Sequence, residues 1–103
     1  MKQFLYATTA LVFGGALILG GPALAYTGQK YAGQAKISMA QATKIALQAQ
    51  PGKVVDRELE REGGGSGLRY SFDIKNGKVT HEVGVDAKTG NILENSIEGP
   101  NAD

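Results

Sequence analysis

The sequence predicts an α+β fold in which one N-terminal helix packs on a four-stranded antiparallel β-meander, giving two layers. The first observation behind this prediction is a pair of alternating apolar and polar runs on either side of Asn76–Gly77. The second is a helical stripe of small apolar residues that begins after Ser38. The third is their order along the chain, a helix followed by strands joined through short turns, which favours a helix on one face of an antiparallel sheet.

The two alternating runs form the centre of the predicted sheet. Asn76–Gly77 is well suited to a type I′ hairpin turn because both residues tolerate a positive φ. A turn at this dipeptide pairs Lys75 with Lys78. The register that follows is Ile74 opposite Val79, Phe72 opposite His81, Tyr70 opposite Val83 and Leu68 opposite Val85. One face of the hairpin is then apolar along its length, and a slip of one residue would destroy this match.

The predicted helix has clear signals at both ends. Ser38 is a good N-cap, and Gln41 three residues later completes a capping box. Ile37 stands where a hydrophobic staple residue belongs. Pro51–Gly52 ends the helix because proline disfavours helical geometry at the residue before it. The apolar stripe is mostly alanine, so we expect the helix to lie close to the sheet.

The outer strands are less regular. Residues 53–62 predict a charged edge strand in which Val55, Arg57 and Leu59 share one face, and a charged helix over residues 57–62 is the alternative. The run Gly63–Gly67 predicts a loose loop. After a turn at residues 86–90, residues 91–93 predict a short fourth strand with Ile92 opposite Val85. Residues 94–103 predict a frayed tail in which Ile97 is the one residue able to pack.

The N-terminus predicts a secretory signal peptide over residues 1–25. It has a charged start, a short apolar core and a small-x-small pattern that places cleavage between Ala25 and Tyr26. The alternative is an uncleaved membrane anchor, for which the apolar core is short. Residues 26–36 predict a flexible tether, with docking of Tyr31 on the domain as the alternative. The folded domain is expected at residues 37–97 and a disordered tail at residues 98–103.

Charge and composition exclude several function classes. Cleavage removes Lys2, which leaves ten basic and ten acidic residues in the mature chain. A neutral chain of mixed charges offers no surface that tracks phosphates, so we expect no nucleic-acid binding. Contact with a membrane is expected only through the signal segment, if that segment stays uncleaved. The chain has no cysteine, which rules out disulfides and thiolate metal sites.

The residues show little chemistry. His81 is the single histidine, and the predicted register places it beside Phe72, on the face opposite Asp73 and Glu82. Asp73 and Glu82 are expected to lie diagonally on the open polar face, at roughly 7–8 Å, as solvated carboxylates. The glycine run lacks the sixth-position glycine and following helix of a dinucleotide fingerprint. We therefore predict no enzyme activity, no cofactor and no metal site; His81, Asp73 and Glu82 are the remaining candidates for metal or ligand binding.

The order of these segments resembles the PepSY domain family. The resemblance rests on Ile37–Ser38 at the helix start, Pro51–Gly52–Lys53–Val54–Val55, and above all the run from His81 to Leu93 with its Val-Asp-Ala-Lys-Thr-Gly segment. It covers about residues 37–93. The family is named for the propeptides of secreted metallopeptidases and for a spore cortex germination protein. The resemblance implies a non-catalytic extracytoplasmic module that inhibits or regulates peptidases, and it carries over no catalytic residue.

Two functional hypotheses follow from the sequence. The first is a periplasmic or secreted regulatory domain that binds a protein partner, with an exported peptidase as the candidate partner. The second is a periplasmic protein that senses or binds a small ligand or a metal cation. In the propeptides the domain is joined to its peptidase, whereas no peptidase is attached in this chain, so any peptidase partner would be a separate molecule. The sequence sets neither the partner nor the oligomeric state.

Overall fold

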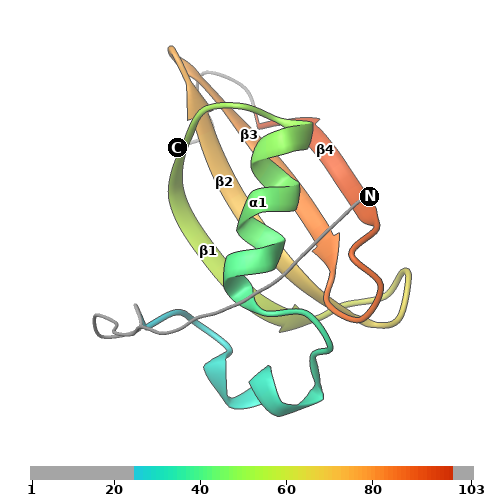
Figure 1. The fold of residues 1–103 in the computed structure, drawn as a ribbon. Coiled ribbons are helices and arrows are strands. Elements are labelled where there is room, and N and C mark those ends of the chain that lie inside the picture. Colours follow the sequence, from blue (N-terminus) through green and yellow to red (C-terminus); the bar gives the residue numbers. More distant parts are fainter. Residues whose placement is uncertain (1–24, 99–103) are drawn as a thin grey trace.

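The structure, a computed structural model, describes residues 25–98. It confirms the predicted fold class: one α-helix lies on one face of a four-stranded antiparallel sheet (Figure 1). The predicted signal peptide up to Leu24 and the predicted tail from Gly99 lie outside the described residues. In chain order the elements are the 3-10 helix η2 (Gln29–Gln34), α1 (Met39–Ala49), β1 (Lys53–Arg61), β2 (Leu68–Asn76), β3 (Val79–Asp86) and β4 (Ile92–Ile97).

The core lies between α1 and the sheet. The strands follow one another in the order β1-β2-β3-β4, and α1 contacts β2, β3 and β4. Most buried positions of the two central strands fall on the predicted apolar face. The exceptions are Arg69, Ser71, Gly84 and Asp86, which lie on the other face toward the glycine-loop end of the sheet. The buried apolar side chains are Ala42, Ala46, Leu59, Leu68, Tyr70, Phe72, Ile74, Val83, Val85 and Ala87. Because the helix presents alanine to the sheet, the backbones approach closely and the bulky side chains come from the strands.

The helix begins as its capping signals predict. The Ser38 hydroxyl accepts the Gln41 N–H at 3.0 Å, and the Gln41 side chain accepts the Ser38 N–H at 2.8 Å, which completes the capping box. The buried Tyr70 hydroxyl donates to the Ile37 carbonyl at 2.7 Å. This bond satisfies a polar group in the core and ties the start of α1 to the centre of the sheet.

The predicted hairpin register is wrong by two residues. Asn76 pairs with Val79, so the two-residue turn is Gly77–Lys78, with Gly77 at a φ of +66°. Phe72 therefore faces Val83 and not His81, and Tyr70 faces Val85. The frame that forms aligns the two buried aromatic residues with the two buried valines. A shift of two keeps every side chain on its predicted face, so the prediction of the apolar face survives the error.

Strand β1 is a strand, as predicted, and not the alternative charged helix. A β-bulge between Val54 and Asp56 shifts the register, however. The residues of β1 that precede the bulge therefore lie on the opposite face from the predicted one. Val54 pairs with Ile74 and packs against the core, whereas Val55 is 51% exposed. The prediction that Val55 shares the face of Leu59 is therefore wrong, because the extra residue of the bulge breaks the strict alternation.

Secondary structure is also present at both ends of the described chain. Residues 29–34 of the predicted tether form η2, and Tyr26 and Tyr31 pack against the core. Figure 1 shows η2 below the end of the sheet, beside the start of α1. Residues 94–97 of the predicted frayed tail belong to β4, where Ile92 pairs with Val85 as expected.

Candidate functional site

The sheet surface that faces away from α1, here called the polar face, is strongly acidic. Lys53 and Lys75 stand on this face next to the β2–β3 turn, and Asp86 at its other end. The remaining residues of the face come from the four strands and the position after β4: Asp56, Glu58, Glu60, Arg69, Ser71, Asp73, Thr80, Glu82, Glu94, Ser96 and Glu98. Seven of these eleven residues are acidic and one is basic. Because strand side chains alternate between faces, the run of charges in β1 and the alternate acidic positions of β4 end up together.

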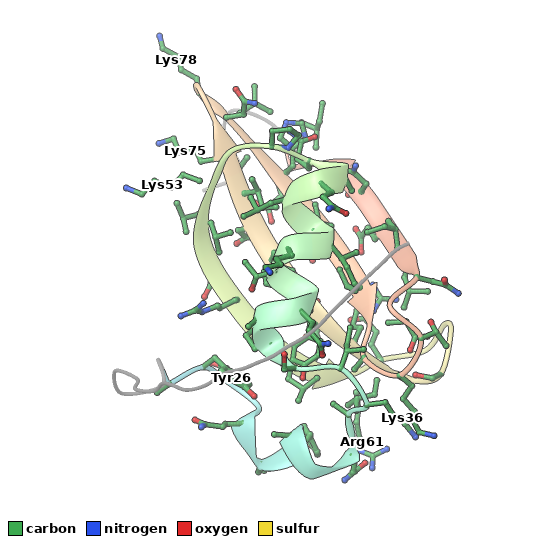
Figure 2. All side chains as sticks on the ribbon, in the orientation of Figure 1. Tyr26, Lys36, Lys53, Arg61, Lys75 and Lys78 are labelled. Carbon is green, nitrogen blue, oxygen red and sulfur yellow. The ribbon has the colours of Figure 1, made fainter. Side chains whose placement is uncertain are left out.

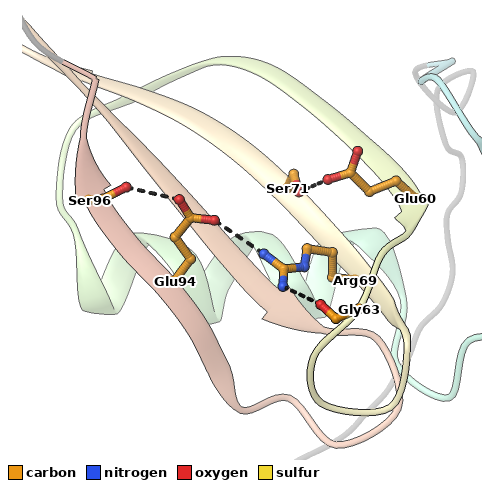
Figure 3. A network of polar contacts seen from close by, with 6 residues as sticks. All are labelled: Glu60, Gly63, Arg69, Ser71, Glu94 and Ser96. Carbon is orange, nitrogen blue, oxygen red and sulfur yellow. Dashed lines mark hydrogen bonds and ion pairs between the residues drawn. The ribbon is translucent and has the colours of Figure 1, made fainter.

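At one end of the polar face, Arg69 organises a hydrogen-bonded network (Figure 3). Its side chain pairs with Glu94 at 3.2 Å and donates to the Gly63 carbonyl at 3.2 Å. Glu94 also accepts the Ser96 hydroxyl at 2.9 Å, and the Ser71 hydroxyl donates to Glu60 at 2.7 Å. Arg69 is only 7% exposed, so little water screens the attraction between its guanidinium and the carboxylate of Glu94. We call Arg69, Glu94, Ser96 and Gly63 the Arg69 network.

Asp86 closes the same end of the sheet. It is 2% exposed, and its carboxylate accepts the N–H and hydroxyl of Ser66 and the N–H groups of Lys88 and Thr89. Burial alone would raise the pKa of Asp86, but these hydrogen bonds to the charged form outweigh it and lower the pKa. The bonds hold residues 63–67, the glycine loop, against the turn after β3. The loop was predicted to be loose, and its contact with Asp86 corrects that prediction.

Toward the β2–β3 hairpin, three carboxylates stand together without such donors. Asp73, Glu82 and Glu98, the acidic triad, bring carboxylate oxygens within 4.8 Å of one another. Asp73 and Glu82 are direct cross-strand partners. The predicted diagonal arrangement is therefore wrong, and the error comes from the two-residue error in the predicted hairpin register. Directly opposed like charges are destabilising on a sheet. The triad therefore stores electrostatic repulsion that a proton or a positive group can relieve.

The proton affinities of the triad report this repulsion. Partial burial, the charge of Glu98 and a hydrogen bond with it, and the charges of Asp56 and Glu58 raise the pKa of Asp73 to about 6. Partial burial raises the pKa of Glu82 as well, together with the charges of Glu94, Glu98, Asp73 and Glu60. The same causes raise the pKa of Glu58, with Glu60, Asp56 and Glu62 as its charged neighbours. The repulsion thus extends across the face from β1 to β4.

The structure separates the three candidate residues that the sequence suggested. Asp73 and Glu82 meet, but His81 pairs with Ile74 and belongs to the apolar side of the sheet. Glu98 takes its place as the third member of the group, and it was missed because residues 94–103 were expected to fray. Its signal was the alternation of Glu94, Ser96 and Glu98, which matches one face of a strand. Carboxylate groups of this kind are common on open surfaces without an ion, so we assign no metal site to the triad.

Positive charge gathers at the hairpin end of the polar face. Lys53, Lys75 and Lys78 project from the end of the sheet at the β2–β3 turn (Figure 2), where Lys53 and Lys75 are cross-strand partners. The lysines do not contact the acidic triad in any ion pair among residues 25–98. Within residues 25–98, acidic side chains thus cover most of the polar face and these three lysines lie at its hairpin end.

The predicted cleavage residues lie at the start of the described chain. Ala25 is exposed, whereas Tyr26 is half-buried and packs against the core. Both line a shallow hollow of about 440 Å³ that Thr27 and residues 54–57 of β1 complete. Cleavage between Ala25 and Tyr26 stays a prediction. Of the helices described in residues 25–98, none has the length and apolar character that crossing a membrane requires.

Comparison with known proteins decides the family. The family model described as "Peptidase propeptide and YPEB domain" (PepSY) matches residues 36–95, which span α1 and nearly all of the sheet. The chain belongs to the PepSY family. No curated protein and no solved structure gave a significant match. PepSY domains are in general non-catalytic propeptide or regulatory modules, occur in exported proteins and are associated with peptidases.

Proposed function

We propose that this protein is a non-catalytic, exported PepSY module that binds a protein partner and regulates it, and that the partner is a peptidase of the cell envelope or of the secreted fraction. The observation that carries the proposal is the family match over residues 36–95. The geometry supports it in a second way. The polar face offers a broad, charged and open surface, which suits contact with a folded protein better than enclosure of a small substrate.

The arrangement of side chains also supports a binding role over catalysis. His81 and the acidic triad lie on opposite sides of the sheet, so the histidine is not placed to exchange a proton with these carboxylates. The triad itself is open to water, whereas catalytic carboxylate pairs work in a cleft that excludes it. We therefore propose that the protein is not an enzyme and acts on its partner by occupying a surface.

The test is an inhibition assay with peptidases of the host's envelope and secreted fractions. The purified exported protein should slow cleavage of a peptide substrate, and the effect should saturate as its concentration rises. As a matched pair, the triple variant Asp73→Asn, Glu82→Gln, Glu98→Gln should lose inhibition, whereas Lys53→Gln, Lys75→Gln, Lys78→Gln should retain it. A peptidase fraction that is unaffected by any concentration of the protein would remove the proposal.

The sequence also suggested sensing of a small ligand or metal cation. The same purified protein separates the two functions through thermal unfolding with a panel of metals and metabolites, because a real ligand stabilises the folded state by mass action. The regulatory function predicts an unchanged melting temperature across that panel. A rise that saturates with one cation, and that disappears in Asp73→Asn, would favour the sensing function instead.

A further inference from the structure

The two edges of the sheet differ in what covers them. At β1 the chain covers its own edge: Thr27 forms a parallel bridge with Glu58, and its carbonyl accepts the Leu59 N–H at 2.8 Å. Gly28 passes so close that a Cβ there would lie 1.6 Å from the Leu59 carbonyl oxygen. The bulge at Val55 and the charges of β1 protect the rest of that edge.

At β4 no such cover is present among the described residues, and we call this edge open. The Glu98 N–H donates to the Thr80 carbonyl at 2.8 Å, so the backbone of Glu98 turns toward β3. Because alternate residues of an antiparallel strand point their backbone groups to opposite sides, those of Asn95 and Ile97 point away from β3. Within residues 25–98 no strand pairs with this edge. The pairing of β4 with β3 has a register shift of its own at Gly84–Val85, opposite Ile92 and Glu94. The stretch from Asn95 to Ile97 lies beyond that shift and contains no charge and no proline, features that usually protect an edge.

The side chains of β4 specify what can lie beside it. Glu94, Ser96 and, directly after the strand, Glu98 stand on the polar face, where Glu98 forms the acidic triad with Asp73 and Glu82. On the other side Ile97 is 63% exposed, and Asn95 donates to the Ala49 carbonyl at the end of α1. A strand added here meets carboxylates on one face and an exposed isoleucine on the other, which favours alternating basic and apolar residues.

We infer that the open edge of β4 is the docking strand of this protein, and that it takes an extended segment of a partner protein with alternating basic and apolar residues in antiparallel pairing. The inference rests on the proposed function and names the surface that performs it. Main-chain hydrogen bonds to Asn95 and Ile97 hold the segment, and its basic side chains relieve the repulsion of the triad.

A second copy of the chain is the poorer occupant. Antiparallel pairing of two β4 strands about a two-fold axis would bring Glu94 and Glu98 of both copies onto one continuous face, where they add to the acidic triads. Like charges opposite one another weaken such a pair. The charge of this edge therefore favours a basic partner over self-association.

Peptide binding tests the inference directly. The probe is a fluorescein-labelled peptide of about eight residues, a length that covers a typical strand, with lysine and valine alternating. Measured by fluorescence anisotropy at low salt, it should bind the purified exported protein, and a glutamate–valine peptide should bind at least roughly tenfold more weakly. Amide signals of Asn95 and Ile97 should shift in NMR spectra, and those of Arg57 and Leu59 should not. Equal affinity for the two peptides, or shifts confined to β1, would overturn the inference.

N-methylation of the peptide distinguishes strand addition from simple charge attraction. In antiparallel pairing the valines lie opposite Asn95 and Ile97 and exchange hydrogen bonds with them, whereas the lysine N–H groups point to water. Methylating the valine nitrogens should abolish binding, and methylating the lysine nitrogens should leave it nearly unchanged. An equal effect of the two modifications would rule out the docking strand.

A pair of surface variants tests the same point on the protein. Ser96→Lys places a positive charge on the β4 edge and should lower the affinity for the lysine–valine peptide roughly tenfold. Val55→Lys places the same charge on the β1 edge at another exposed position and should leave affinity unchanged. The opposite pattern would move the docking strand to β1. Because this assay contains no peptidase, peptide binding without peptidase inhibition would reject the proposed function and leave the docking strand in place.

Discussion

The two ends of the polar face treat negative charge in opposite ways. Near the glycine loop, Asp86 and Glu94 are each held by hydrogen-bond donors, and Arg69 adds a buried positive charge. Toward the β2–β3 hairpin, Asp73, Glu82 and Glu98 face one another. The pKa values move accordingly, downward at Asp86 and upward at Asp73. The contacts at the first end stabilise the fold, whereas the repulsion at the second end lowers its stability.

The largest effect should come from removing the Asp86 carboxylate. Asp86→Ala leaves the N–H groups of Ser66, Lys88 and Thr89 without their acceptor, in a place with little access to water. We expect the free energy of unfolding to fall by about 3 kcal/mol, measured by urea denaturation with circular dichroism. The exposed control Glu62→Ala, outside the acidic triad, should change it by less than about 0.5 kcal/mol. Similar losses in the two variants would remove the distinction between the ends.

A smaller loss should follow from Arg69→Met, which keeps the aliphatic stem and removes the charge. Glu94 and the Gly63 carbonyl then lose their donor, and we expect the free energy of unfolding to fall by about 2 kcal/mol. Lys78→Met removes a positive charge from the exposed hairpin turn and serves as the matched control. If both variants unfold at the same urea concentration, net charge and not the Arg69 network explains the loss.

At the other end the sign should reverse. Asp73→Asn removes one of the opposed charges, and we expect the free energy of unfolding at pH 7 to rise by about 1 kcal/mol. A shift of one pKa unit corresponds to about 1.4 kcal/mol, and water around this open face screens part of the shift. Glu62→Gln, an exposed carboxylate outside the triad, should leave stability unchanged. A variant less stable than the wild type would show that Asp73 is held by favourable contacts.

The pH dependence of stability should show the same contrast. The pKa of Asp73 rises from 3.8 to about 6 on folding, so the folded state holds a proton that the unfolded chain has released within this window. Stability should therefore increase as the pH falls from about 6 toward 3.8, and Asp73→Asn should flatten this rise. The lowered pKa of Asp86 acts the other way: its contribution is present above 3.8 and is lost as the pH falls through its folded-state pKa. Thermal melts at a series of pH values measure both branches.

Patterns within one element were predictable from the sequence. The alternation of Tyr70 and Phe72 with polar residues fixed the buried face, and Ser38 with Gln41 fixed the start of the helix. Relations between elements were harder. The single glycine at Gly77 is compatible with two hairpin registers that differ by two residues, and both leave each side chain on the same face of the sheet. In β1, nothing in the sequence Val54–Val55 distinguishes a bulge from a regular strand.

The acidic triad was only partly predictable for the same reason. Asp73 and Glu82 were recognised as neighbours, but their direct opposition depends on the hairpin frame. Glu98 lies beyond a stretch without apolar alternation, where backbone bonds such as that from Glu98 to Thr80 hold the strand. The alternation of Glu94, Ser96 and Glu98 is compatible with one face of a strand, but Ile97 is the one apolar residue among residues 94–98, too little to predict that strand.

The glycine loop has a practical consequence for anyone modifying this protein. Four glycines in five residues invite the insertion of an affinity tag or a fluorescent label. Yet Gly65 lies so near Asp86 that an added Cβ would stand 2.3 Å from its Oδ2 atom, and Ser66 donates to the same carboxylate. An insertion in this loop would break the hydrogen bonds that hold it to Asp86 and the turn after β3. The exposed Gly77–Lys78 turn at the opposite end of the sheet is the better place for a label, because it lies far from these bonds.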